Sequence, residues 1–172
     1  MITFFLKQKI KKISDRYVRD KKFREYKDIH QVMLFFNMED LDVVKTFSDA
    51  LIADGKQVIA YTYDNGADKL KPPKLPDRYK ILTKKSLNCF CFPYNDVISA
   101  FSEYSADTLI DLTVRPSLIL KYLFLNSSSD FRVGFNRENG RLYDLLIERN
   151  EEQDFTFFVN QMLFYMKSLR TK

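Results

Sequence analysis

Glycine, histidine and tryptophan are scarce in this chain of 172 residues, which contains four, one and none of them respectively. The four glycines are too widely spaced to form a G-x-G-x-x-G turn or a phosphate-binding P-loop, so ordinary dinucleotide and P-loop NTP binding are disfavoured. The only histidine, His30, precedes the first predicted strand, away from the carboxyl strand ends where open α/β sheets bind ligands. We therefore expect no catalytic device built on histidine.

Cysteine and long apolar runs are also in short supply. The two cysteines, Cys89 and Cys91, are too close for a long-loop disulfide and have no neighbouring histidine or second cysteine pair for a zinc site. No stretch approaches the roughly 18 apolar residues of a membrane-spanning helix, and the apolar start at residues 1–6 lacks the preceding basic residues of a secretion signal. We expect a soluble, cytoplasmic protein, at most peripheral to the inner membrane, with inert thiols, no metal and no cofactor.

Positive charge is concentrated near the N-terminus. The chain has 28 Lys and Arg against 23 Asp and Glu, a net charge of +5. Residues 1–28 hold ten of the basic residues and four of the acidic ones, which leaves 18 basic and 19 acidic residues elsewhere. The balance is therefore +6 for this segment and −1 for residues 29–172. A nucleic-acid-binding surface that covers the whole domain is not supported, and any polyanion contact would use the N-terminal segment.

Residues 1–28 are predicted to form a basic amphipathic helical arm, and residues 29–172 a single α/β domain. Apolar residues recur at helical spacing along one side of the arm: Ile2, Leu6, Ile10, Ile13 and Tyr17. Basic residues occupy the other side: Lys7, Lys11, Lys12, Arg16 and Arg19. Three interpretations remain open, namely packing on the domain or a partner subunit, lying on an anionic membrane, and binding nucleic acid. The membrane is preferred to nucleic acid, because a polyanion would not bury the apolar stripe.

The remaining sequence alternates between two hydrophobic periods. Short apolar runs typical of buried strands fall at six places: residues 32–36, 58–63, 80–83, 108–112, 131–134 and 142–147. Apolar residues at helical spacing occupy four further segments: residues 39–54, 95–105, 117–125 and 154–170. Gly55 follows the first of these helices, where it can adopt the left-handed cap conformation. The alternation predicts an α/β, Rossmann-like fold with a mainly parallel sheet of five to six strands and helices on both faces.

Three polar residues are expected to meet at the carboxyl edge of this sheet. Asn37 follows the first strand, Asp111 stands near the end of the fourth, and Arg115 lies in the loop after it. Open α/β sheets bind ligands at this edge, and Arg132 could add positive charge toward an anionic ligand. The alternative is structural: Asp111 accepts hydrogen bonds from the neighbouring loop and fixes the crossover, while Arg132 is a solvated surface residue.

The closing helix carries more aromatic residues than one buried face requires. Its apolar stripe consists of Phe155, Phe158, Val159, Met162, Met166 and Leu169. Phe157 and Phe164 point elsewhere, which predicts a second packing partner, either the N-terminal arm or another subunit. Isolated exposed aromatic residues would be the simpler explanation.

Five motifs span most of the sequence: Lys71-Pro72-Pro73, Leu87-Asn88-Cys89-Phe90-Cys91-Phe92-Pro93, Asp107-Thr108-Leu109-Ile110-Asp111-Leu112-Thr113, Phe131-Arg132-Val133-Gly134 and Tyr143-Asp144-Leu145-Leu146-Ile147. Together they resemble an uncharacterised single-domain family of Bacteroidetes-type bacteria. The resemblance implies one intact domain and no particular activity. More distantly, two short motifs are similar to the N-terminal half of heptosyltransferase-like glycosyltransferases: Ile110-Asp111-Leu112 and Arg132-Val133-Gly134-Phe135. This similarity implies common ancestry of the fold more than transferase activity.

Two functional hypotheses follow. No complete catalytic set can be assembled from the sequence, so the leading hypothesis is a non-catalytic binding or assembly domain. Its contact surfaces would be the N-terminal basic helix and the C-terminal helix, toward a protein partner, a second copy or an anionic membrane. The alternative is a glycosyltransferase-related domain that binds a sugar or nucleotide in the crevice around Asn37, Asp111 and Arg115.

Overall fold

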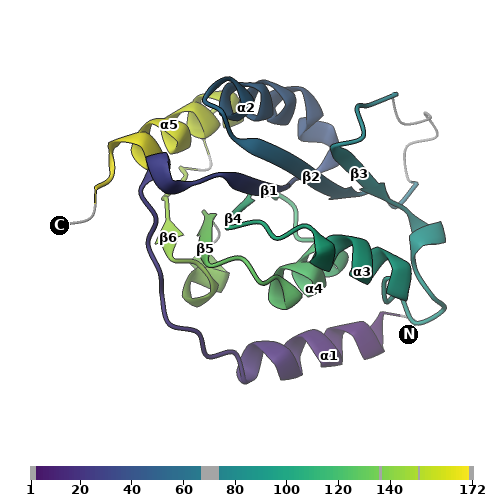
Figure 1. Ribbon diagram of the computed structural model, residues 1–172. Helices are drawn as coiled ribbons and strands as arrows, with labels where there is room; N and C mark the ends of the chain where they lie inside the picture. The colour runs from purple at the N-terminus through teal and green to yellow at the C-terminus, as the bar shows by residue number, and fades with distance from the viewer. Residues whose placement is uncertain (1–2, 67–73, 136, 151, 171–172) are drawn as a thin grey trace.

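The computed structural model describes residues 3–66, 74–135, 137–150 and 152–170, and it contains one open sheet of six parallel strands (Figure 1). The strands follow the order β3-β2-β1-β4-β5-β6 across the sheet. Their bounds are Gln31–Phe35 (β1), Gln57–Tyr63 (β2), Tyr79–Leu82 (β3), Thr108–Asp111 (β4), Phe131–Gly134 (β5) and Leu145–Leu146 (β6). The predicted α/β, Rossmann-like arrangement is confirmed, and every strand pair is parallel.

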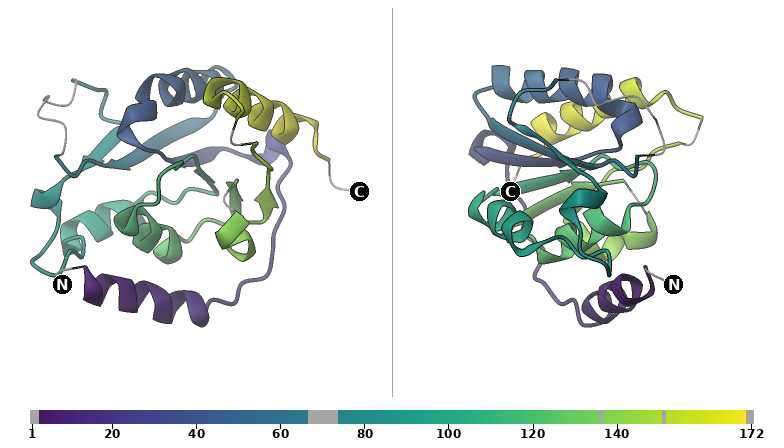
Figure 2. Two further views of the ribbon diagram at one scale, coloured as in Figure 1. Left: turned by 180° about the vertical axis from the view of Figure 1, so that it is seen from behind. Right: turned by 90° about the vertical axis from the view of Figure 1, so that its right-hand side faces the viewer.

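In the described segments, five α-helices lie around the sheet. They are α1 (Phe4–Asp15), α2 (Leu41–Ala53), α3 (Asn95–Glu103), α4 (Leu118–Asn126) and α5 (Phe155–Ser168). Helices α2 and α5 cover one face of the sheet, and α3 and α4 cover the other (Figures 1 and 2). Helix α1 packs on α4 from outside and adds a further layer on that side.

Strand β1 shows why the sheet lies in the middle of the molecule. Its residues alternate between two cores: Val32 and Leu34 face α2 and α5, whereas Met33 and Phe35 face α3 and α4. All four side chains are buried. Because β1 is covered on both faces, each of these positions requires an apolar residue, which explains the continuous apolar run. Gly55 ends α2 with φ of +79°, as its position after the helix predicted.

Two elements differ from the sequence-based expectation. Helix α1 ends at Asp15, so the predicted helical arm of residues 1–28 is only partly helical. Residues 16–25, called the strap below, run extended along the β5 side of the molecule to a short 3-10 turn at Tyr26–Asp28 (Figure 2). Strand β6 is limited to Leu145–Leu146, because a 3-10 helix at Arg137–Leu142 precedes it and the Tyr143 amide donates to the Gly140 carbonyl.

Candidate functional site

The crossover connections reverse direction between β1 and β4, which are neighbours at the centre of the sheet. The chain leaves β1 toward α2 on one face and leaves β4 toward α4 on the other. Such a switch point leaves space at the carboxyl ends of the strands. Here it holds a cavity of about 160 Å³ between the end of β4, the first turn of α4 and the ring of Tyr143. We call this cavity the crevice.

Asp111 lies at the edge of the crevice and is held by three donors. Its Oδ1 accepts hydrogen bonds from the Thr113 amide at 3.0 Å and the Thr113 hydroxyl at 2.6 Å. Its Oδ2 accepts from the Tyr143 hydroxyl at 2.6 Å. Burial raises the pKa of the Asp111 carboxyl, and these hydrogen bonds oppose the rise because they favour the ionised form. Asp111 therefore fixes the β4–α4 loop, as the structural alternative predicted.

Tyr143 reaches Asp111 because its ring packs directly on the backbone of Gly134. A Cβ atom at Gly134 would lie 2.3 Å from Tyr143 Cε1, which is far inside van der Waals contact. Phe124 of α4 supports the ring from the side, with the two ring centroids 5.3 Å apart. Burial raises the pKa of the Tyr143 hydroxyl above its ordinary value, so it stays protonated and donates to Asp111.

Asn37 and Arg115 are brought together, as predicted, but they bind each other. Asn37 Oδ1 accepts from the Arg115 amide at 2.8 Å, and Asn37 Nδ2 donates to the Arg115 carbonyl at 3.0 Å. The exposed Arg115 guanidinium pairs with Glu39 at 3.1 Å. The pair clamps the β4–α4 loop to the end of β1 and lies outside the set of residues that line the crevice.

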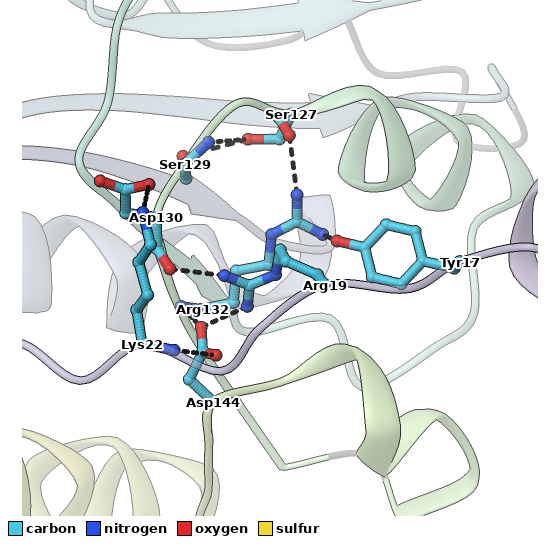
Figure 3. A network of polar contacts seen from close by, with 8 residues as sticks. All are labelled: Tyr17, Arg19, Lys22, Ser127, Ser129, Asp130, Arg132 and Asp144. Atoms are coloured by element: carbon cyan, nitrogen blue, oxygen red, sulfur yellow. Dashed lines mark hydrogen bonds and ion pairs between the residues drawn. The ribbon is translucent and has the colours of Figure 1, made fainter.

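Arg132 was interpreted from the sequence either as a ligand-binding residue of the crevice or as a solvated surface residue, and the structure shows neither. It is 2% exposed, so it is neither a solvated surface residue nor a lining residue of the crevice. Its Nη1 donates to the Tyr17 hydroxyl and its Nη2 to the Ser127 carbonyl at 2.7 Å (Figure 3). The guanidinium also lies over the ring of Phe124. Arg132 thus anchors the strap. Its partner Tyr17 is 115 residues away in sequence, a separation that local patterns do not reveal.

The strap is fixed by further ion pairs with the same edge of the sheet. Arg19 pairs with the buried Asp144 carboxylate and donates to the Asp130 carbonyl. Lys22 pairs with Asp130 at 2.9 Å (Figure 3). Arg24 pairs with the same carboxylate at 3.2 Å. Asp144 also accepts from the Lys22 and Arg132 amides. A large part of the positive charge that the sequence placed on the arm is therefore paired within the molecule.

Of the basic residues of the arm that have no ion pair, four lie on α1. Its four lysines are all exposed, and within the described chain none of them has an ion pair: Lys7, Lys9, Lys11 and Lys12. Of the five basic residues proposed from the sequence as contact residues, Lys7, Lys11, Lys12 and Arg16 are exposed, whereas Arg19 is held by Asp144.

Helix α1 buries one side and exposes aromatic rings on another. Leu6 and Ile10 are buried in the core shared with α4. Phe4 and Phe5 remain 53% and 52% exposed, and the Phe5 ring meets the half-exposed Phe90 with the centroids 5.4 Å apart. An apolar groove runs between Phe5 and Phe90 and is bordered by Lys9 and Lys12.

Phe90 stands at the tip of a tight turn that the sequence builds locally. The Asn88 side chain accepts from the amides of Phe90 and Phe92, and the turn closes through the Asn88 amide and the Phe92 carbonyl. Cys91 takes the left-handed conformation with φ of +64°. We call the exposed set formed by Phe4, Phe5, Lys9, Lys12 and Phe90 the α1 surface.

The contact residues predicted from the sequence do not include Phe4, Phe5, Lys9 or Phe90. Lys9 and the two phenylalanines stand off the basic and apolar stripes that helical spacing defines, so their exposure was not evident. Phe90 reaches them through a contact across 85 positions in sequence. Tyr143 was also missed, because its role depends on the bare backbone of Gly134 beneath its ring.

The described segments contain no group of three His, Cys, Asp or Glu residues that could hold a metal ion. Among the helices of these segments, none is both long and apolar enough to cross a bilayer. Cys89 and Cys91 are free thiols, the first exposed and the second half-buried.

The fold and the crevice define an open α/β domain with a Rossmann-like parallel sheet and a small cavity at its switch point. The model of a family of unknown function, DUF6913, matches residues 3–169, and the chain belongs to this family. The resemblance to an uncharacterised domain family is thereby confirmed, and the similarity to glycosyltransferases stays a prediction. No curated protein and no solved structure matches the chain.

Proposed function

We propose that this protein is a non-catalytic binding domain that docks on the anionic surface of a lipid bilayer through its α1 surface. One observation carries the proposal: three exposed phenylalanine rings and unpaired lysines occupy the same helix and the turn beside it. Aromatic rings enter the interface between headgroups and acyl chains, and lysines bind the anionic headgroups.

The magnitudes favour a reversible contact. A lysine close to an anionic membrane contributes on the order of 1 kcal/mol, so Lys9 and Lys12 of the α1 surface together contribute about 2 kcal/mol. Complete burial of a phenylalanine side chain contributes about 1.5–3 kcal/mol, and each ring of the α1 surface has about half of its surface left to bury. Neither contribution alone gives tight binding, so the proposal requires both.

A bilayer fits this surface better than nucleic acid does. A polyanion would pair with the lysines and leave Phe4, Phe5 and Phe90 in water, whereas a bilayer takes up both kinds of side chain. The neighbouring strap adds little, because Arg19, Lys22 and Arg24 are already paired with Asp130 and Asp144.

Vesicle co-sedimentation with point variants tests the proposal. Deletion of the arm is unsuitable, since it would remove Tyr17 and Arg19, which the fold itself uses. The wild type should sediment with phosphatidylglycerol-containing vesicles and not with neutral phosphatidylcholine vesicles. Replacing Lys9 and Lys12 by Gln should weaken binding about 30-fold, which corresponds to two lysines at about 1 kcal/mol each.

A second variant separates a bilayer from a polyanion. Replacing Phe5 and Phe90 by Ser should weaken vesicle binding by about tenfold or more. The matched control is Lys45→Gln with Phe164→Ser, which makes changes of the same kind on α2 and α5 and should bind like the wild type. If the variant with Ser at positions 5 and 90 sediments with the vesicles as well as the wild type does, bilayer docking is contradicted and the contact is purely electrostatic.

A further inference from the structure

We propose that the exposed face of α5 binds a second copy of this chain in an antiparallel arrangement. The inference concerns the side of the molecule opposite the α1 surface and does not depend on membrane docking. It starts from Phe157 and Phe164, which are 55% and 65% exposed. They lie seven positions apart, nearly two helical turns, so both rings share one stripe, on the side of α5 opposite the buried Phe158 and Met162.

The composition of α5 is that of a helix covered on both sides. Among its 14 residues only Lys167 is charged, although 30% of the whole chain is charged. Helix α4 has the same pattern, with one charge among nine residues, and α1 covers its outer side. Helix α2, whose outer side is open to solvent, carries the exposed Asp42 and Asp49 there. Nothing in the described segments covers the outer side of α5 (Figures 1 and 2), so a second molecule would supply the cover it lacks.

The charges at the two ends of α5 favour a second copy as that molecule. Glu152 and Asp154 precede the helix, whereas Lys167 and Arg170 lie at its end. Glu152, Asp154 and Arg170 are exposed, and within the described chain none of them forms an ion pair. In an antiparallel pair, the acidic end of each helix lies beside the basic end of the other, and the helix dipoles are also opposed. A parallel pair would bring like charges together.

The two rings determine the register of the pair. The midpoint between Phe157 and Phe164 falls between Asn160 and Gln161, so the twofold axis passes at this point. Phe157 of each copy then lies beside Phe164 of the partner subunit, where two aromatic rings pack favourably edge to face. One helix face is smaller than the roughly 800 Å² per partner of a standard interface, so we expect a reversible dimer with a dissociation constant on the order of 100 µM.

This dimer places the two α1 surfaces at its opposite ends. The sheet separates α1 from α5 in each copy, and the twofold axis at α5 points the two copies away from each other (Figures 1 and 2). The two α1 surfaces therefore cannot meet the same bilayer. Loss of the dimer should leave the vesicle docking of each copy unchanged, so the two proposals fail or hold separately.

Sedimentation equilibrium of the full chain tests the dimer. Protein concentrations from about 10 µM to about 1 mM bracket the expected dissociation constant, and the wild type should change from monomer to dimer across this range. Replacing Phe157 and Phe164 by Ser should weaken dimerisation at least tenfold, because four rings are lost from the interface. The matched control is the variant with Ser in place of Phe5 and Phe90, which should dimerise like the wild type. A wild type that stays monomeric at about 1 mM overturns the inference, and so does an equal effect of the two variants.

Thiol crosslinking tests the antiparallel arrangement. With both native cysteines changed to Ser, single cysteines are introduced as Asn160→Cys, next to the predicted axis, and Ser168→Cys, at the end of α5. A crosslinker that spans two packed helices, roughly 8–10 Å, should join two copies of the first variant. It should not join the second, because the two cysteines would lie about 22 Å apart along the helices. Crosslinking at residue 168, or none at residue 160, overturns the antiparallel dimer.

Discussion

At the residue scale, the absence of a side chain at Gly134 determines how the crevice is built. Gly134 has no unusual backbone conformation; its importance comes from the Tyr143 ring that rests on it. The ring position lets the Tyr143 hydroxyl reach Asp111, and Asp111 in turn holds the loop through Thr113. One glycine thus supports a chain of hydrogen bonds from Tyr143 through Asp111 to Thr113 in the loop after β4.

Gly134→Ala should therefore destabilise the protein. The new methyl group would lie 2.3 Å from the ring of Tyr143, so the ring would have to move and weaken its hydrogen bond to Asp111. Overpacking of this kind costs about 1–3 kcal/mol of unfolding free energy, measurable by urea denaturation. Gly140→Ala is the matched control, because its methyl group would lie 3.5 Å from Leu146, and a change within about 0.5 kcal/mol is expected. Equal effects of the two substitutions would contradict this account.

At the scale of elements, the sequence predicted the central sheet and its covering helices well. The four buried residues of β1 form an apolar run, and Gly55 marks the end of α2, so the signals are local and strong. Helix α5 also agrees: Phe158, Val159, Met162 and Met166 are buried as its stripe predicted.

The strap and the α1 surface could not be predicted in the same way. Residues 16–25 lack a hydrophobic period because they are fixed by polar contacts with residues more than 100 positions away, such as those of Arg19 with Asp130 and Asp144. Of the three residues proposed for the crevice, Asp111 lines it, whereas Asn37 and Arg115 bind each other outside it. Tyr143 and the cavity were not predicted, because they depend on packing across the sheet.

Asp144→Ala should loosen the strap. Its carboxylate is almost fully buried, and removing it leaves Arg19 Nη2 and the amides of Lys22 and Arg132 without their acceptor, while Arg19 Nη1 keeps the Asp130 carbonyl. Breaking a buried ion pair costs about 3–5 kcal/mol. Hydrogen exchange followed by mass spectrometry should show faster exchange in residues 16–25 than in β1.

Asp130→Ala is the comparison for the strap. Asp130 is more exposed, and its pairs with Lys22 and Arg24 should contribute only about 0–1 kcal/mol. If residues 16–25 still exchange slowly in Asp144→Ala, the apolar contacts of α1 hold the strap in place without the Asp144 ion pair.

For the whole molecule, the arrangement of layers separates two exposed aromatic regions. Helix α1 lies outside α4, whereas α5 lies across the sheet beside α2 (Figures 1 and 2). The second partner predicted for α5 was the N-terminal arm or another subunit; α1 lies on the other side of the sheet, and the arm meets α5 at the turn Tyr26–Asp28, where Lys167 lies over the Tyr26 ring. Phe157 and Phe164 stay exposed and available to a protein partner or a second copy, which remains a prediction.

This geometry fixes the orientation of a docked molecule. If α1 lies on the bilayer, α5 must face away from it, because the sheet and both helix layers stand between them. Cys89 is exposed and adjacent to Phe90, so it provides a reporter on the α1 surface. With Cys91→Ser, an environment-sensitive fluorophore on Cys89 should shift its emission to the blue on phosphatidylglycerol-containing vesicles, because the label enters the apolar interface. The same label on Phe164→Cys, with both native cysteines changed to Ser, should not shift. A shift at residue 164 with none at Cys89 would mean that α5 contacts the bilayer, and the assignment of the membrane-facing side would have to be reversed.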